Sequence, residues 1–194
     1  MISKSPVVIY AENTPNPEAM KFVANKMLLP DHLSFEFKNK ADAQRSNLAI
    51  SLFEFPFIQQ VFLAANYVTI TKNKMVEWPE VINHLREFVK LFLEEGREVL
   101  DNVNQLSTSE SPHTMPNSEI EGKIIAVLEE YISPAVAQDG GFIAFKSFIN
   151  GIVSVELKGS CAGCPSSTLT LKAGIEGLLK RMVPEVIEVR SIAN

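Results

Sequence analysis

The sequence predicts an α+β protein made of two small domains, and three observations support this. The chain has 194 residues, of which 46% are hydrophobic, so two separate cores can be filled. Both halves contain apolar residues at strand spacing and at helix spacing. A stretch rich in Ser, Thr, Asn and Pro lies between them. We therefore expect an N-terminal domain over residues 1–97, a flexible linker over 98–117 and a C-terminal domain over 118–194.

The first domain combines short strands with two helices. Strands are predicted at residues 7–10, 21–24, 33–37, 61–64 and 67–71. Thr14-Pro15-Asn16-Pro17 predicts an extended turn, because a residue that precedes proline is disfavoured in a helix. Helices are predicted from Ala41 to Phe53 and from Pro79 onward, where apolar residues repeat at i, i+3 and i+4.

The second domain is predicted in the order α-β-β-α-β. Ser118 and Glu121 form a capping-box pattern that begins a helix, and this helix is expected to end before Pro134. Asp139-Gly140-Gly141 then forms a turn. Asn150-Gly151 predicts a hairpin between strands 142–149 and 152–157. A helix over 168–182 and a strand over 186–189 complete the domain.

Charge and hydropathy exclude several classes of function. The net charge is -5, which argues against a surface for nucleic acid. No apolar run approaches the ~18 residues that a membrane helix needs, so no membrane span is expected. Residues 1–10 resemble neither a signal peptide nor a transit peptide, and two cysteines do not make a secreted disulfide framework. We therefore expect a cytoplasmic protein.

The two cysteines of the chain lie three residues apart, at Cys161 and Cys164. They fall between a predicted strand and a predicted helix, and Pro165 suits the first turn of that helix. A helix N-terminus favours a thiolate, and Gly159 and Gly163 leave room for another sulfur to approach. Both cysteines are expected to be exposed. Two thiolates cannot complete a four-thiolate site, so the pattern indicates a site shared by two chains or redox work by the pair.

Several alternatives remain open at this point. The pair could pack as small hydrophobic side chains, or act as a thiol–disulfide oxidoreductase, although the βαβ order of a thioredoxin-like fold is lacking. A zinc-bridged dimer is a third possibility. A zinc site within one chain would need more ligands, and His32, His84 and His113 have no paired spacing. The hydroxyls of the serines that flank the cysteines, Ser160, Ser166 and Ser167, are expected to cap the helix in preference to bonding sulfur.

Longer strings of sequence resemble a known family. Residues 139–141, 157–167, 170–176 and 184–186 resemble the NifU C-terminal domain, also called the Nfu domain, through Asp-Gly-Gly, Leu-Lys-Gly-Ser-Cys-Ala-Gly-Cys-Pro-Ser-Ser, Thr-Leu-Lys-Ala-Gly-Ile-Glu and Pro-Glu-Val. Residues 14–17, 21–22 and 67–72 of the first domain are similar to the N-terminal domain that often precedes it in Nfu proteins.

This resemblance implies an iron–sulfur cluster scaffold or carrier and no catalysis. It implies a cluster, typically [4Fe–4S], held by Cys161 and Cys164 from each of two subunits, so the cluster-bound form is a homodimer. It also implies cluster or sulfur donor proteins, and apo iron–sulfur proteins as acceptors. The count of thiolates agrees, because a [4Fe–4S] cluster takes about four cysteine ligands and each chain offers two. Asp139 to Gly141 is expected to be a turn that could lie near the cysteines.

Overall fold

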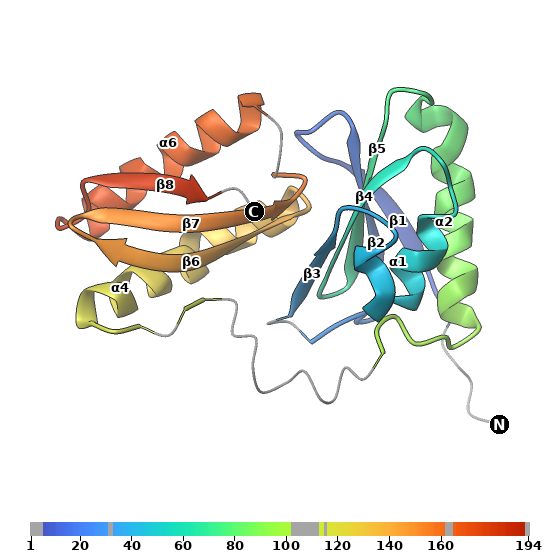
Figure 1. The fold of residues 1–194 in the computed structure, drawn as a ribbon, viewed down its shortest axis with the longest axis horizontal. Helices are drawn as coiled ribbons and strands as arrows, with labels where there is room; N and C mark the ends of the chain where they lie inside the picture. Colours follow the sequence, from blue (N-terminus) through green and yellow to red (C-terminus); the bar gives the residue numbers. More distant parts are fainter. Residues whose placement is uncertain (1–5, 31–32, 102–112, 115, 162–164, 193–194) are drawn as a thin grey trace. The chain divides into compact units, whose positions relative to one another are not determined.

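The computed structural model describes residues 6–30, 33–101, 113–114, 116–161 and 165–192, with residues 165–170 described by their backbone only. The chain divides into two compact units, Met1–Ser109 and Glu110–Asn194. Each unit contains one sheet together with helices (Figure 1), which confirms the predicted α+β class.

The first unit is built on a fully antiparallel five-stranded sheet in the order β1-β2-β5-β4-β3. Its strands are β1 (Ile9–Asn13), β2 (Ala19–Ala24), β3 (Ser34–Phe37), β4 (Ile58–Ala64) and β5 (Tyr67–Lys72). The described residues of this unit form a 3-10 turn, η1 (Asp42–Arg45), and the α-helices α1 (Asn47–Leu52) and α2 (Trp78–Glu94).

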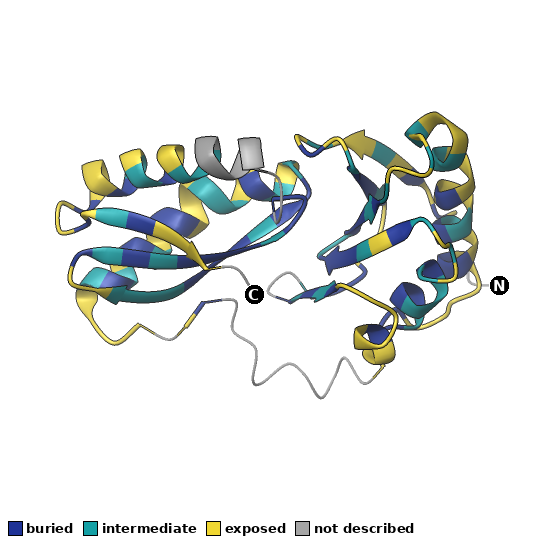
Figure 2. Cartoon of the chain, turned by 45° about the horizontal axis from the view of Figure 1, so that its top comes forward, coloured by how far each residue is buried: buried dark blue, intermediate teal, exposed yellow. Residues whose placement is uncertain are grey.

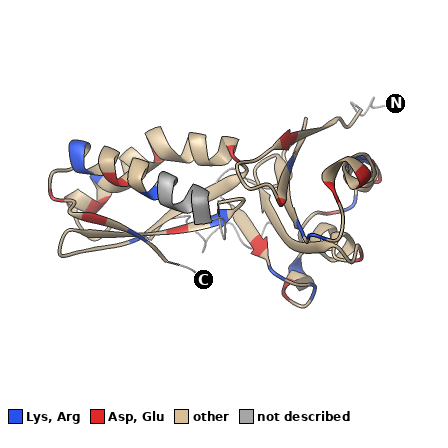
Figure 3. Ribbon diagram, turned by 90° about the horizontal axis from the view of Figure 1, so that it is seen from above, with Lys and Arg blue, Asp and Glu red and all other residues tan. Residues whose placement is uncertain are grey.

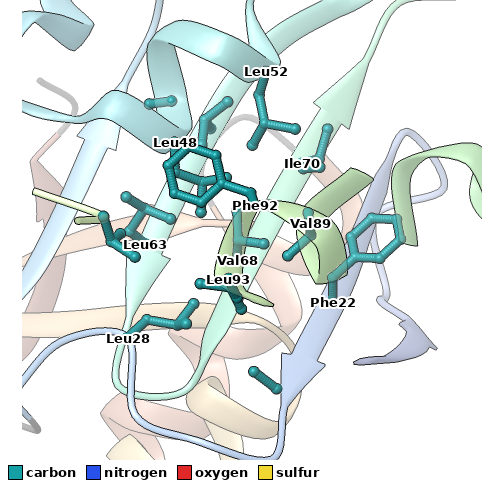
Figure 4. Packing of buried hydrophobic residues seen from close by; sticks show 14 of the residues in the cluster. Phe22, Leu28, Leu48, Leu52, Leu63, Val68, Ile70, Val89, Phe92 and Leu93 are labelled. Atoms are coloured by element: carbon teal, nitrogen blue, oxygen red, sulfur yellow. The ribbon is translucent and has the colours of Figure 1, made fainter. Parts of the chain in front are cut away.

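The core of the first unit lies between the helices and one face of this sheet. The apolar residues of α2 recur at helical spacing, and those at Leu85, Val89 and Phe92 are fully buried. Figure 4 shows Val89 and Phe92 with their neighbours from α1 and the strands, among them Phe22, Leu48, Leu52, Leu63, Val68 and Ile70.

The helix predicted from Ala41 to Phe53 is wrong in its continuity. Ser46 interrupts it with an extended backbone, at φ -127° and ψ 107°, and divides the segment into η1 and α1. The Ser46 hydroxyl accepts a hydrogen bond from the N–H of Ala49 at 3.1 Å and donates one to the carbonyl of Val99 at 2.8 Å. A buried serine that caps one helix and holds a distant segment therefore outweighs the helical spacing around it.

The Thr14 to Pro17 segment forms the predicted turn. The Thr14 hydroxyl donates to the carbonyls of Asn16 and Ala19 at 2.9 and 3.0 Å. The indole N–H of Trp78 donates to the carbonyl of Pro17 at 2.9 Å, so the turn also contacts the start of α2. These hydrogen bonds show that the segment has a structural role as a turn held against α2.

The second unit has a three-stranded sheet in the order β6-β7-β8, in which β6 and β7 are antiparallel and β7 and β8 are parallel. Its helical segments are α4 (Glu119–Val127), the π-helical turn η2 (Leu128–Ile132), α5 (Ser133–Gln138) and α6 (Pro165–Met182). Its strands are β6 (Gly141–Ile149), β7 (Ile152–Gly159) and β8 (Glu188–Ile192).

Helices α4 and α6 pack on the same face of the second sheet. Alternate strand residues point into this core, with Ile124 and Leu128 from the first helical segments and Ile175 and Leu179 from α6. In α6, the buried residues lie along the side toward the sheet and exposed ones along the other (Figure 2).

The helical region before the turn is longer than predicted. Ser118 caps α4 by accepting from the N–H of Glu121 at 3.2 Å, as expected, but the Glu121 carboxylate accepts from the N–H of Asn117. The prediction that the helix ends before Pro134 is wrong. The π-helical turn ends at Ile132 and a new α-helix, α5, begins at Ser133. Pro134 therefore lies in the first turn of α5, where its missing N–H is tolerated. The Asn150-Gly151 hairpin is confirmed, with φ of 51° and 81°.

Both ends of the range expected to be a linker pack against a unit where the structure describes them. Val99 and Leu100 are buried in the first core. His113 is 8% exposed, and its Nδ1 accepts the N–H of Phe145 at 2.8 Å, while the N–H of Thr114 donates to the carbonyl of Phe145 at 3.0 Å. The rest of the predicted linker, residues 102–112 and 115, lies outside the described residues.

Acidic and basic residues are interspersed along the elements of both units (Figure 3). In the described ranges, no helix combines the length and the apolar character needed to cross a bilayer.

Candidate metal centre

Cys161 lies two residues after the end of β7 at Gly159. Gly159 has a φ of 70°, a left-handed conformation that glycine adopts readily, and it turns the chain out of the sheet. Helix α6 begins at Pro165, earlier than the predicted range of 168–182, and Pro165 lies in its first turn as expected. The strand-to-helix position of the motif thus agrees with the sequence analysis.

The Asp139-Gly140-Gly141 turn contacts the segment that carries Cys161. Gly141 pairs with Gly159 across the β6–β7 ladder. The N–H of Ser160 donates to the carbonyl of Gly140 at 3.2 Å, and the Ser160 hydroxyl donates to the carbonyl of Asp139. The turn predicted here is therefore present and lies beside the first cysteine, which it meets through its backbone.

The expectation that Cys161 is exposed is wrong. Its side chain is part of the second core, together with Ile143 and Leu157, and the residue is only 5% exposed. The Ser160 hydroxyl donates to the carbonyl of Asp139 and lies 3.8 Å from the Cys161 Sγ, within reach of a hydrogen bond to sulfur, which was the alternative to a capping role. Close packing between β6 and the end of β7 explains the burial of Cys161.

Glycine at 141 is the feature that the sequence analysis missed. A Cβ placed on Gly141 would lie 2.6 Å from the Sγ of Cys161 and 3.0 Å from the carbonyl oxygen of Lys158. Sulfur therefore occupies the space of the absent side chain. A Gly-Gly pair ahead of a strand that pairs with the cysteine-bearing segment was the available signal.

Cys164 lies outside the described residues, as do the side chains of Ser166 and Ser167. Across the part of the chain that the structure describes, no three His, Cys, Asp or Glu side chains gather as a metal site would require. His84 is exposed on α2 with its ring edge-on to Phe55, and His113 is hydrogen-bonded as described above. His32 lies outside the described residues.

Charged side chains lie on the face of β6 and β7 that points away from the helices. The Glu156 carboxylate lies 2.8 Å from the Lys146 ammonium and 3.6 Å from that of Lys158. Burial acts to raise the pKa of Glu156, but hydrogen bonding and attraction from both lysines outweigh it and hold this pKa below its usual value. The negative charge of Glu156, which lies in the strand that leads to Cys161, is therefore balanced by the two lysines.

Two family models match the chain. Residues 9–96 match the N-terminal domain of scaffold proteins of the Nfu/NifU type, and residues 124–190 match the NifU-like domain. The chain is 33% identical over 195 residues to human "NFU1 iron-sulfur cluster scaffold homolog, mitochondrial", covering 96% of this chain and 72% of that protein. The Drosophila willistoni protein of the same name is 32% identical, with 99% and 66% covered.

Two solved structures are also similar. The solution structure of a NifU-like protein from Saccharomyces cerevisiae has a TM-score of 0.47 and 26% identity, covering 53% of this chain and 91% of that one. A crystal structure of a Staphylococcus aureus protein has a TM-score of 0.36 and 16% identity, covering 41% and 95%.

The names of these relatives contradict one expectation. The human and Drosophila proteins are named mitochondrial, so the prediction of a cytoplasmic protein is overturned. That prediction rested on the character of residues 1–10 and on the count of two cysteines, which are only indirect signs of a compartment. The matches to both domain models, together with 33% identity to a relative of which the chain covers 72%, show that this chain belongs to the Nfu/NifU-like family of iron–sulfur cluster scaffold proteins.

Proposed function

We propose that this chain holds an iron–sulfur cluster between two copies of itself and delivers it to apo-proteins. The cluster is cargo, of the [4Fe–4S] type, and its ligands are Cys161 and Cys164 of each copy. The chain is a carrier and not an enzyme, with donor proteins that supply cluster or sulfur and apo iron–sulfur proteins as acceptors. Membership of a family of cluster scaffold proteins supports this function.

The observation that carries the proposal is the number of thiols. The chain has two cysteines, whereas a [4Fe–4S] cluster takes about four thiolate ligands. The described residues contain no cluster of His, Cys, Asp and Glu that could complete a site within one chain. Two copies would supply the four thiolates.

The position of the motif supports the same function. Cys164 immediately precedes Pro165, the first residue of α6. The N-terminus of a helix carries a partial positive charge, which favours thiolates and an anionic cluster. A cluster held at the junction of two chains can also leave by ligand exchange with an incoming thiolate, as a carrier requires.

Anaerobic reconstitution with iron and sulfide tests the ligands and the stoichiometry. We expect broad absorption in the blue, about four irons and four sulfides per two chains, and a dimer by light scattering. Cys161→Ala and Cys164→Ala should each lose the cluster, while Ser147→Ala, a substitution on β6, should keep it. A fully loaded monomer, or a loaded cysteine variant, would refute the shared site.

Transfer needs a separate test. The loaded protein is mixed with an apo-enzyme whose activity requires a [4Fe–4S] cluster, with a chelator present to trap released iron. Recovery of activity faster than with free iron and sulfide supports delivery. Recovery that the chelator abolishes would mean that the chain only releases iron.

A thiol–disulfide oxidoreductase is the alternative function of the same cysteine pair. The burial of Cys161 bears on both functions, because an attacking thiol must be accessible and a cluster ligand must reach iron, so reconstitution has to decide between them. The discriminating result is a colourless protein after reconstitution that nevertheless reduces a protein disulfide.

We also propose that the chain divides into an N-terminal domain of residues 1–97, a linker of residues 98–117 and a C-terminal domain of residues 118–194. The cluster site belongs to the second unit alone. Both thiols lie in that unit. A fragment of residues 110–194, which keeps the contact between His113 and Phe145, should bind as much cluster as the whole chain. A folded but colourless fragment would show that the first domain contributes to the site.

A further inference from the structure

The thiol of Cys161 occupies the space that a side chain at position 141 would need. The Cβ of a residue there would lie 2.6 Å from the Cys161 Sγ, closer than such atoms approach in proteins, and would make tight contacts of 3.0 Å with the carbonyl oxygen of Lys158 and 3.2 Å with the Cys161 Cβ. Glycine at 141 and the inward position of this thiol therefore depend on each other.

The backbone around this contact has little freedom to yield. Gly141 and Gly159 pair in the β6–β7 ladder, and Ser160 donates hydrogen bonds to the carbonyls of Asp139 and Gly140. Gly140 and Gly159 both have left-handed backbone conformations, with φ of 77° and 70°. The carbonyl oxygen of Lys158, at 3.0 Å, would have to give by a few tenths of an ångström, and the larger conflict, with the Cys161 Sγ, would be relieved by movement of that side chain.

The inward position is not one from which sulfur can bind a cluster that a second chain also binds. A ligand sulfur must present a lone pair to iron, but Cys161 is 5% exposed and packs with Ile143 and Leu157. Binding therefore requires the side chain to turn out of the core. The inward and outward positions are two states of one side chain, and any change that disfavours one raises the population of the other.

We propose that Gly141 is a positioning residue for Cys161. The absence of a side chain at 141 leaves the space in which the Cys161 thiol packs in the cluster-free chain, and the hydrogen bonds of Ser160 fix the backbone beside it. The thiol turns outward when the cluster binds. This inference rests on the proposed function and adds that the cluster-free chain shelters one of its two ligands.

The test measures how fast Cys161 is alkylated in the cluster-free, reduced full-length chain. All variants carry Cys164→Ser, so one thiol remains. Iodoacetamide is the probe and intact-mass spectrometry gives the rate. We expect Gly141→Ala to raise this rate by about tenfold or more, because overpacking disfavours the inward position.

Gly177→Ala is the matched control, since it makes the same change at an exposed position of α6 with no atom within 4 Å of the added Cβ. Its alkylation rate should equal that of the parent. Ser160→Ala is a second variant, which removes the hydroxyl bond to Asp139 and should raise the rate a fewfold. Circular dichroism confirms the fold of each variant. If Gly141→Ala does not fold, Ser160→Ala decides the matter.

An unchanged rate in the folded variants at 141 and 160, or an equal rise in the control at 177, would overturn the proposal. The rate is measured without a cluster, so it does not depend on whether the parent chain binds iron and sulfide. Failure of the parent to reconstitute would instead refute the proposed function and leave the rate comparison intact.

Discussion

Replacing Cys161 by serine should destabilise the second unit more than replacing it by alanine. Serine keeps the size of the side chain but places a hydroxyl in the core beside Ile143 and Leu157. The Ser160 hydroxyl lies 3.8 Å from the Cys161 Sγ, a separation that suits sulfur but is too long for a bond between two hydroxyls, and a buried hydroxyl with such poor pairing costs about 1–3 kcal/mol. Alanine only removes one buried atom, which costs about 1 kcal/mol when transfer and packing are combined. The order of the two variants therefore reports the polarity around the thiol.

Urea unfolding of the cluster-free chain measures this difference. With a slope of about 1 kcal/mol per molar, the serine variant should unfold about 1–3 M earlier than the parent by circular dichroism of the second unit. The chain has a single tryptophan, Trp78, which lies in the first unit, so its fluorescence transition should stay unchanged and serves as an internal control. A serine variant as stable as the alanine variant would show that the thiol lies in polar or hydrated surroundings, contrary to our description of the site.

Three further predictions concern the two units. Burial lowers the pKa of His113, so the unfolded chain binds the proton more readily, and the stability of the second unit should fall as pH drops below about 6.5; urea melts of the parent and of His113→Phe test this, and an equal pH dependence in both would contradict it. Glu18→Gln removes the carboxylate that lies 2.9 Å from the ammonium of Lys72, whose side chain is 2% exposed, and should lower the free energy of unfolding of the first unit by about 1–3 kcal/mol, measured by tryptophan fluorescence. Glu54→Gln, at an exposed ion pair with Lys40, should lower it by less than about 1 kcal/mol, and equal losses in the two variants would refute this difference. Gly151→Ala should destabilise the hairpin by about 1–3 kcal/mol because φ is 81° there, and a neutral melt by circular dichroism would show that the turn can relax.

Predictions based on local patterns agree well with the structure. The period of apolar residues places α2, and Asn150-Gly151 places the hairpin, because both signals act over a few residues. One error came from a bond between distant residues and the other from a local irregularity of the helical backbone. Ser46 interrupts a predicted helix since its hydroxyl bonds the carbonyl of Val99, and a π-helical turn carries the helical region past Pro134.

For the site, the sequence by itself determined which atoms are available. Two thiols at a spacing of three residues, between a strand and a helix, limit the chemistry to soft ligands or redox sulfur, and the count of ligands requires a second chain for a four-thiolate cluster. These are properties of composition and local order, so no coordinates are needed to state them. They also carry the resemblance that the two family matches confirm.

Only the tertiary structure decided where the Cys161 sulfur lies. Gly141 and Cys161 are twenty positions apart in the sequence, and their contact arises because the β6–β7 ladder pairs Gly141 with Gly159. No local pattern encodes a distance across a ladder, since it depends on register and on which faces of the strands meet. Burial follows in the same way, because a thiol that looks exposed in a glycine-rich loop becomes part of the core once the neighbouring turn leaves space for it.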